Sequence, residues 1–183
     1  GKAGREQLVF SGGVTYQDVN DLRVGGGDEL PYTNYSARGG NARLRAEIAE
    51  GNELSFQLQS MEHPRTPRFD ELVPGFRQAT PPSSTCYFEP QVRDFAQLRW
   101  RGSNPTALWD SAEAQLGRQE IRDDRRSRDF GSVNEDRERN TDTTDGFVFQ
   151  AGKAIGDAHY LGWGGEYYED EVDSSRIRRN IDT

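Results

Sequence analysis

The sequence predicts an all-β protein, built as an antiparallel up-and-down meander of about seven strands. Two observations carry this prediction. Seven segments alternate strictly between apolar and polar residues, and segments of turn-forming residues separate them. A period of two places successive side chains on opposite faces of a sheet. The hydrophobic content of 32% is low for a chain of 183 residues, so a thick apolar core is not expected.

Each segment has one apolar row and one polar row. In chain order, the apolar rows are Leu8, Phe10, Gly12, Val14 and Tyr16; Ala42, Leu44, Ala46 and Ile48; Leu54, Phe56 and Leu58; Val92, Ala96, Leu98 and Trp100; Ala112, Ala114 and Leu116; Phe147, Phe149 and Ala151; and Leu161, Trp163, Gly165 and Tyr167. One stretch leaves an alternative open, since residues 105–128 also place apolar side chains at helical spacing and Thr106 is a suitable helix cap.

Composition excludes several classes of protein. The net charge of −8 argues against a nucleic-acid partner, which needs a basic surface. The single cysteine, Cys86, excludes an internal disulfide and a zinc ribbon. No run of about 18 apolar residues occurs, so the sequence predicts no membrane-spanning helix.

The connections differ in length along the chain. Short turns are predicted near residues 50–53, 102–105 and 156–158, and long polar connections near 25–32, 61–90 and 122–142. In a meander, this alternation places every short turn at one end of the sheet and every long loop at the other. Outer-membrane barrels have this asymmetry. A soluble antiparallel sheet, apolar inside and polar outside, remains the alternative interpretation of the same pattern.

The barrel interpretation assigns each row a side. The residues expected to face lipid are Leu44, Phe56, Leu98, Phe149 and Trp163. The residues expected to face a water-filled lumen are Arg43, Arg45, Gln57, Gln59, Arg99, Arg101, Glu113 and Gln115. A polar lumen wall of this kind needs partners for its charges, either neighbouring side chains or water.

Four stretches resemble the barrel strands of TonB-dependent outer-membrane receptors. They are Tyr-Ser-Ala-Arg-Gly-Gly-Asn-Ala at 35–42, Asn-Glu-Leu-Ser-Phe-Gln-Leu-Gln at 52–59, Thr-Pro-Arg-Phe-Asp-Glu-Leu at 66–72 and Tyr-Phe-Glu-Pro-Gln-Val-Arg at 87–93. Within that family the chain is most similar to the haem, haemoprotein and transferrin-type receptors. The FRAP and NPNL motifs of many haem receptors are absent, so no haem-ligand residue is carried over.

The resemblance implies a location and a set of partners. It implies a 22-stranded barrel in the cell outer membrane, with an N-terminal plug domain through which the TonB system supplies energy. The cargo would be an iron chelate, haem or a similar nutrient. Since seven strands cannot close such a barrel, we expect residues 1–183 to be a partial barrel domain, a fragment without the plug and the remaining strands.

Candidate chemistry is sparse. His63, Arg65 and Arg68, in the second long connection, are the candidate contacts for a captured ligand, since histidine is a common metal ligand. Acidic runs at 123–124, 135–136 and 169–171 contain oxygen ligands suited to calcium but lack EF-hand spacing, so solvated loop charges are expected there. No resident metal or cofactor is predicted.

Two further functions compete with transport. One is a soluble sheet that binds protein or carbohydrate through its long loops. The other is an enzyme of the barrel-hydrolase type, which is the weakest interpretation because no nucleophile and base pair and no GxSxG elbow occur. The sequence therefore predicts no catalytic residue.

Overall fold

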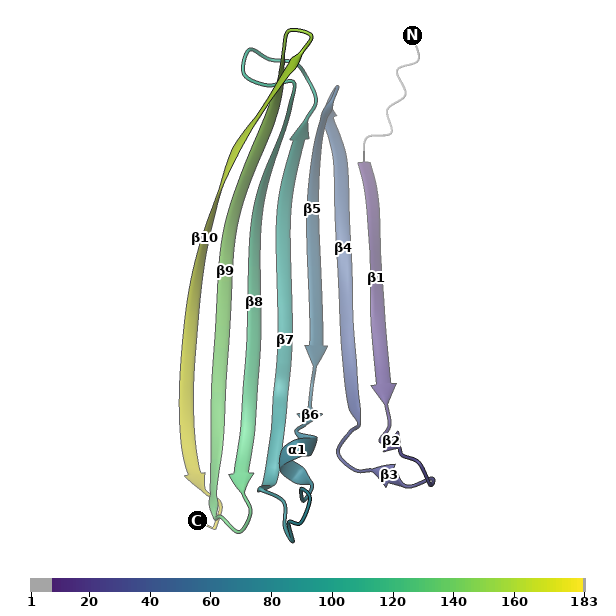
Figure 1. The fold of residues 1–183 in the computed structure, drawn as a ribbon, viewed down its shortest axis with the longest axis vertical. Helices are drawn as coiled ribbons and strands as arrows, with labels where there is room; N and C mark the ends of the chain where they lie inside the picture. The colour runs from purple at the N-terminus through teal and green to yellow at the C-terminus, as the bar shows by residue number, and fades with distance from the viewer. Residues whose placement is uncertain (1–7, 183) are drawn as a thin grey trace.

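The protein is one broad antiparallel sheet, as the computed structural model of residues 8–182 shows (Figure 1). Residues 1–7 and 183 of the predicted domain lie outside the described residues. The long strands, in their order across the sheet, are β1 (Leu8–Val19), β4 (Tyr35–Ala49), β5 (Asn52–His63), β7 (Ser83–Gly102), β8 (Ser111–Asp129), β9 (Asn134–Ile155) and β10 (His159–Asn180). Each long strand pairs antiparallel with the next one along the chain. The prediction of a seven-stranded antiparallel meander is confirmed.

Three short strands and one helical turn complete the structure. Strands β2 (Leu22–Arg23) and β3 (Glu29–Leu30) form a small hairpin apart from the main sheet. Strand β6 (Thr66–Pro67) pairs with β7 beyond the end of β5 and so continues its line, and helix α1 (Phe69–Leu72) follows. Among residues 8–182, no helix is long and apolar enough to cross a membrane.

Two of the three predicted long connections are shorter than expected, and one predicted short turn is longer. The connection predicted at 61–90 shrinks because β5 runs on to His63 and β7 begins at Ser83. The polar stretch at 122–142 is mostly strand, with only residues 130–133 outside β8 and β9. Its charged side chains pair across the strands, so it does not need an apolar row to stay extended.

The connection predicted as a short turn at 102–105 spans residues 103–110. The Thr106 hydroxyl accepts hydrogen bonds from the backbone N–H groups of Leu108 and Trp109, at 3.1 and 2.9 Å. Thr106 therefore caps a single turn, and the helix considered for residues 105–128 is wrong, since β8 begins at Ser111.

The strand register joins the apolar rows into one continuous surface. Side chains that pair directly across the sheet share a face. One such row is Phe10, Leu44, Phe56, Leu98, Leu116, Phe147 and Tyr167. We call the face that carries this row the apolar face, and the face that carries Arg43, Gln57 and Arg99 the polar face.

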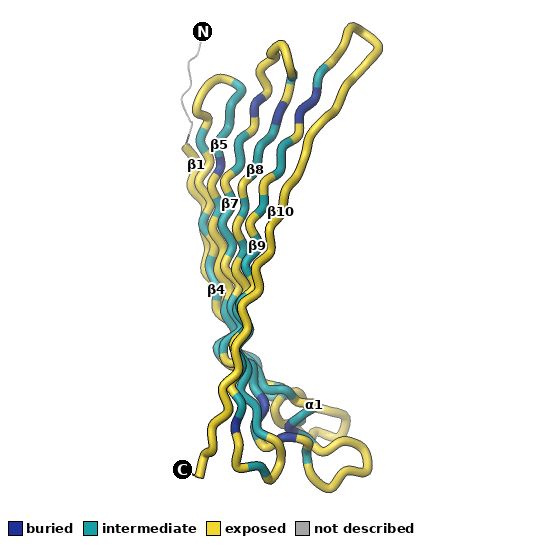
Figure 2. The backbone as a smooth tube through the Cα atoms, turned by 90° about the vertical axis from the view of Figure 1, so that its left-hand side faces the viewer, coloured by how far each residue is buried: buried dark blue, intermediate teal, exposed yellow. Residues whose placement is uncertain are grey.

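The apolar face has no protein layer over it. Leu44 and Phe56 are each 41% exposed, Leu98 is 39% exposed and Trp163 is 43% exposed. Figure 2 shows the consequence, a thin twisted sheet whose residues are almost all exposed or half-buried. A sandwich would cover such a face with a second sheet about 10 Å away. No second sheet packs on the apolar face within residues 8–182.

Gly164 is one of the glycines that allow close strand contact on the polar face. A Cβ atom at Gly164 of β10 would press into the carbonyl oxygen of Phe149 and would lie 3.0 Å from the Cα of Gln150. These are backbone atoms of the paired strand β9, so they cannot swing away as a flexible side chain does. At the adjacent Gly165, which points to the apolar face, nothing lies within 4 Å.

We predict that Gly164→Ala lowers the free energy of unfolding by about 1–3 kcal/mol, because the added methyl group forces β10 away from β9. Gly165→Ala is the matched control and should not be destabilising. Thermal unfolding of both variants in detergent micelles measures the difference. Equal melting temperatures for the two variants would contradict the predicted close approach.

Candidate functional site

The polar face carries a compact network of hydrogen bonds between the end of β7 and the start of β8. The carboxylate of Glu113, on β8, accepts hydrogen bonds from Arg99 at 2.6 Å and from Arg101 at 2.7 Å, both on β7. One row away, the Gln97 amide donates to the Gln115 carbonyl oxygen at 2.9 Å. Glu113 is only 19% exposed, so two arginines compensate a half-buried carboxylate.

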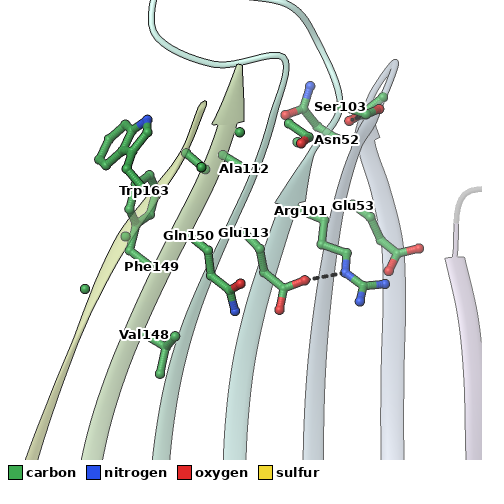
Figure 3. A pocket seen from close by; sticks show the side chains of 18 of the residues that line it. Asn52, Glu53, Arg101, Ser103, Ala112, Glu113, Val148, Phe149, Gln150 and Trp163 are labelled. Atoms are coloured by element: carbon green, nitrogen blue, oxygen red, sulfur yellow. Dashed lines mark hydrogen bonds and ion pairs between the residues drawn. The ribbon is translucent and has the colours of Figure 1, made fainter. Parts of the chain in front are cut away.

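The same face is hollowed toward the turn end, where β4–β5 and β9–β10 reverse (Figure 3). A hollow of about 1050 Å³ extends there, and its charged and amide side chains include Glu53, Arg101, Glu113, Gln150 and Glu166. Glycines of β9 and β10 line its far side. The lining carries side chains of both charges, and Tyr160 lies at its rim. The hollow is therefore not a purely apolar pocket.

All eight residues predicted to face a lumen lie on the polar face. They are Arg43, Arg45, Gln57, Gln59, Arg99, Arg101, Glu113 and Gln115. The structure joins the last four into the network above and places Arg45 3.5 Å from Glu53. The five residues predicted to face lipid, Leu44, Phe56, Leu98, Phe149 and Trp163, all lie on the apolar face. That these two faces meet water and lipid stays a prediction.

The three candidate ligand contacts near the second connection do not form one site. The Arg65 guanidinium lies 3.8 Å from the ring centre of Tyr87, and the Arg68 guanidinium lies 5.7 Å from that of Phe88. Tyr87 and Phe88 are consecutive in β7 and point to opposite faces of the sheet. Arg65 and Arg68 are therefore separated by the sheet. His63 packs its ring 6.0 Å from that of Tyr35.

Helix α1 folds over the polar face and is anchored there. The Arg68 backbone N–H donates to the Cys86 carbonyl oxygen at 2.9 Å, and the Ser83 hydroxyl donates to Glu71 at 3.0 Å. Leu72 and Cys86 are both buried, and burial raises the pKa of the Cys86 thiol. The hydrogen bond from Arg68 lowers the pKa of Asp70, whose carboxylate it holds at 2.6 and 2.9 Å.

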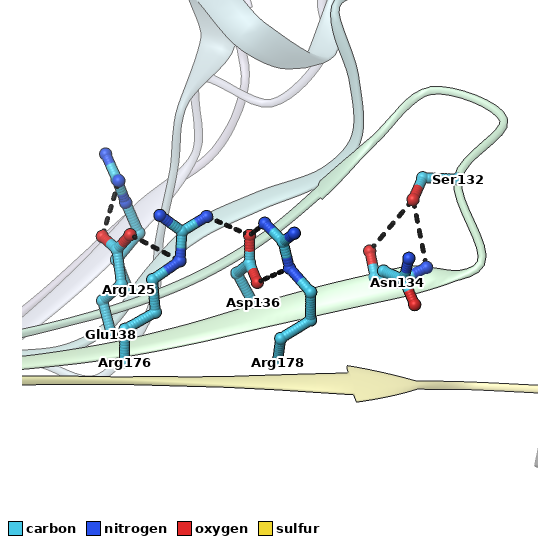
Figure 4. Close-up of polar contacts among 7 residues, drawn as sticks. All are labelled: Arg125, Ser132, Asn134, Asp136, Glu138, Arg176 and Arg178. Atoms are coloured by element: carbon cyan, nitrogen blue, oxygen red, sulfur yellow. Dashed lines mark hydrogen bonds and ion pairs between the residues drawn. The ribbon is translucent and has the colours of Figure 1, made fainter.

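A ladder of ion pairs crosses the polar face at the loop end, the end opposite the short turns (Figure 4). We call it the ion ladder. It runs from Arg125 on β8 to Glu138 on β9, then through Arg176 on β10 to Asp136 and Arg178. Asp136 accepts hydrogen bonds from both Arg178, at 2.7 and 2.8 Å, and Arg176. These bonds hold the pKa of Asp136 well below its usual range.

The opposite face of the same strands carries a second, more buried ion cluster. Glu135 is 5% exposed and lies between the Nε atoms of Arg126, at 2.7 Å, and Arg137, at 3.1 Å. Burial tends to raise the pKa of Glu135, but the hydrogen bonds from the two arginines outweigh it and lower that pKa. The acidic pair at 135–136 thus divides between the two faces.

Sequence reasoning missed Trp109, which completes an aromatic row at the turn end. Trp109, in the connection before β8, lies 6.5 Å from Trp100 and 6.2 Å from Phe149, and Phe149 lies 5.1 Å from Trp163. Trp109 lies two residues before β8, in a connection, so the alternation of residues within strands could not assign it to a face. The four rings form one row on the apolar face, which we call the aromatic row.

Within residues 8–182, no group of three or more His, Cys, Asp or Glu side chains is placed to hold a metal ion. The acidic run at 169–171 forms no ion pair among the described residues, whereas the other two runs considered for calcium have arginine partners: Asp124 pairs with Arg139 at 3.4 Å, and Glu135 and Asp136 pair with arginines as above. Arginine, not a cation from solution, compensates these carboxylates.

The ion ladder predicts a pH dependence. Because the folded-state pKa of Asp136 is depressed, its stabilisation is present above the unfolded value near 3.8 and is lost as the pH falls below that value. We expect Asp136→Asn to lower the melting temperature at pH 7 and to flatten the loss of stability in acid. Asp173→Asn on β10 is the control, since Asp173 forms no ion pair among the described residues. Melting curves from pH 7 to pH 3 test this, and identical acid slopes for wild type and Asp136→Asn would contradict it.

Comparison with known proteins adds no relative. No protein-family model matches the chain, and neither the curated proteins nor the solved structures include a match. The function has to be argued from the two faces of the sheet and from the ends of its strands.

Proposed function

We propose that the chain is a section of the barrel wall of a TonB-dependent outer-membrane receptor, which imports an iron chelate, haem or a similar nutrient. The observation that carries the proposal is the uncovered apolar face, which extends across all seven long strands. The receptor family and its cargo come from the resemblance of the strand sequences, and the geometry supports the barrel wall.

Lipid is the environment that suits this face. Soluble proteins seldom expose contiguous apolar patches of more than a few hundred Å². Here a row of leucine, phenylalanine and tyrosine side chains crosses the whole sheet, and each of them is at least 39% exposed in the described part of the chain. Water would order around the row at a cost of about 25 cal/mol per Å², and acyl chains remove that cost.

The strands are long enough to cross a bilayer and continue beyond it. A tilted membrane strand needs about 9–11 residues, whereas β7–β10 contain 19 to 22. Two residues past the row of Leu116 and Phe147, the apolar face carries Arg118 and Asp145, which pair at 3.2 Å. From there to the loop end both faces are charged, as expected for strands that have left the membrane.

The other border of the apolar band is aromatic. The aromatic row lies beside the turns at the turn end, and Lys153 next to it donates hydrogen bonds to Asp110, at 2.7 Å, and to the Thr106 carbonyl. Tryptophan rings concentrate at the membrane–water interface, where one edge is apolar and the other is wet. The turn end is accordingly the periplasmic side, and the loop end is extracellular.

This arrangement gives the polar face its role in import. A ligand captured at the loop end would pass along a wall whose charges already have partners, so that it is guided without being held tightly. In the family that the chain resembles, a plug domain fills the lumen and the TonB system displaces it. The hollow at the turn end is the part of this wall with room for such a filling. The alternative of a soluble binding sheet requires a cover for the apolar face, and no observation in the described part of the chain supplies one.

We predict that an arginine on the apolar face is destabilising. Placed in the complete receptor, Leu98→Arg or Leu44→Arg should lower the free energy of unfolding by about 2–4 kcal/mol, the cost of a cation near the bilayer midplane. Gln57→Arg, on the adjacent strand but on the polar face, should have an effect below about 1 kcal/mol. Urea titration of the protein in liposomes measures all three. A greater loss for Gln57→Arg than for Leu98→Arg would reverse the assignment of the faces.

The orientation is tested separately by thiol labelling of whole cells. Gln78, in the connection after α1, and Asp157, between β9 and β10, are both exposed and lie at opposite ends of the sheet. With Cys86 buried and unreactive, Gln78→Cys should react with a membrane-impermeant reagent and Asp157→Cys should react only after lysis. Labelling of Asp157→Cys alone on intact cells would invert the proposed topology.

A further inference from the structure

The second ion cluster at the loop end lies beside a groove that the import proposal does not use. The groove has a volume of about 440 Å³ and lies on the continuation of the apolar face beyond the membrane band. Five arginines and three carboxylates line it, of which Arg125 and Glu138 pair with each other on the polar face. With the adjoining Glu135 counted, the arginines exceed the carboxylates by one, in a chain whose net charge is −8. We call it the arginine groove, and its central residues are Arg126, Arg137, Arg139 and Arg179.

Three arginines of this groove are held through their Nε atoms. Arg126 and Arg137 each donate Nε to the buried Glu135, and Arg139 donates Nε to Asp124 at 3.4 Å. No hydrogen bond from an Nη atom of these three is present within residues 8–182. The buried carboxylates thus fix the side chains, while the outer forks of the guanidinium groups stay available.

The fourth arginine has no internal partner. Arg179 pairs in register with Glu135 across β9 and β10, yet it forms no ion pair among the described residues. Its sequence neighbour Arg178, on the polar face, differs completely, since both its Nε and its Nη2 are used by Asp136. The two arginines on the polar face of β10, Arg176 and Arg178, are both held by Asp136. Arg179, on the apolar face, is left with its guanidinium group available.

An acceptor accompanies the free donors. Asp124 lines the groove, and its Oδ1 atom is buried and has no hydrogen-bond partner among the described residues; Arg122 Nε, on the same face, is also buried without a partner there. A buried polar atom without a partner costs about 1–3 kcal/mol. A bare anion would satisfy the arginines but not Asp124, which needs an O–H or N–H donor.

We propose that the arginine groove binds a sugar that carries phosphate or carboxylate groups. The anionic group accepts paired hydrogen bonds from the guanidinium forks, which match phosphate and carboxylate geometry. A sugar hydroxyl donates to the Asp124 carboxylate, whose side chain is 16% exposed and can turn its free oxygen toward the groove. The volume suits a single sugar ring with its charged substituent. If the sheet is a barrel wall, the groove faces outward above the membrane, so the sugar could belong to an outer-leaflet glycolipid or be soluble.

The test uses the intact protein in detergent and calorimetric titration with glucose 6-phosphate, with glucose as the uncharged control. Binding of the phosphate alone is expected, and Arg179→Gln should weaken it about tenfold, the loss of one charge-assisted hydrogen bond. Arg23→Gln removes the same charge from the β2–β3 hairpin and should leave the affinity within about twofold. Arg179→Lys keeps the charge without the fork and should recover only part of the binding. No binding, or equal losses in Arg179→Gln and Arg23→Gln, would overturn the proposal.

A second arm distinguishes the source of the sugar. The protein is added to phosphatidylcholine vesicles with and without diphosphoryl lipid A, and the bound fraction is measured by flotation. Retention that depends on both lipid A and Arg179 assigns the groove to a membrane glycolipid. Binding of glucose 6-phosphate without Arg179-dependent retention assigns it to a soluble sugar. Neither result depends on import, so the groove and the transport proposal can fail independently.

Discussion

One constraint governs this structure: a continuous apolar face that the protein does not cover. Only five hydrophobic residues in the described chain are buried, namely Ala37, Leu72, Cys86, Ala112 and Ala151, and no large side chain is fully enclosed. A sheet of this size cannot draw its stability from an internal core. Under the proposed function, a bilayer supplies an apolar solvent on one side, along the length of strand that carries the apolar rows.

Toward the loop end, beyond the apolar rows, ion pairs and not apolar contacts hold the strands together. On the polar face ion pairs join β8 to β9 and β9 to β10, and on the opposite face they join β8 to β9. Exposed pairs contribute little singly, but a buried carboxylate held by two arginines is costly to break. This explains how strands of 22 residues stay paired to their ends in water. The two faces of this region differ accordingly. On the polar face the arginines of the ion ladder are paired with carboxylates, and on the other face the arginine groove keeps guanidinium groups available for a ligand.

Features that depend on neighbouring residues in the sequence could be predicted, whereas features that depend on pairing between distant residues could not. Alternation is local, so the rows of Leu44, Phe56 and Leu98 and their shared face followed from the sequence alone. The stretch at 122–142 was misjudged because both of its faces are polar, and only pairing between distant residues keeps it extended. Arg65 and Arg68 were grouped because they are near in sequence, yet the sheet separates them, since they stack on consecutive residues of β7. The split of Glu135 and Asp136 between two arginine clusters depends on register, which composition does not reveal.

The contact of the apolar face with lipid is tested most directly by tryptophan fluorescence. All three tryptophans of the chain, Trp100, Trp109 and Trp163, lie in the aromatic row. The intact protein is reconstituted into vesicles of phosphatidylcholine brominated at defined depths, and quenching by the bromines is compared with quenching by aqueous acrylamide. The account predicts strong quenching by bromines near the headgroups, weaker quenching by bromines near the bilayer centre, and protection from acrylamide. Emission that acrylamide quenches fully and brominated lipid does not affect would show that the apolar face does not meet the membrane.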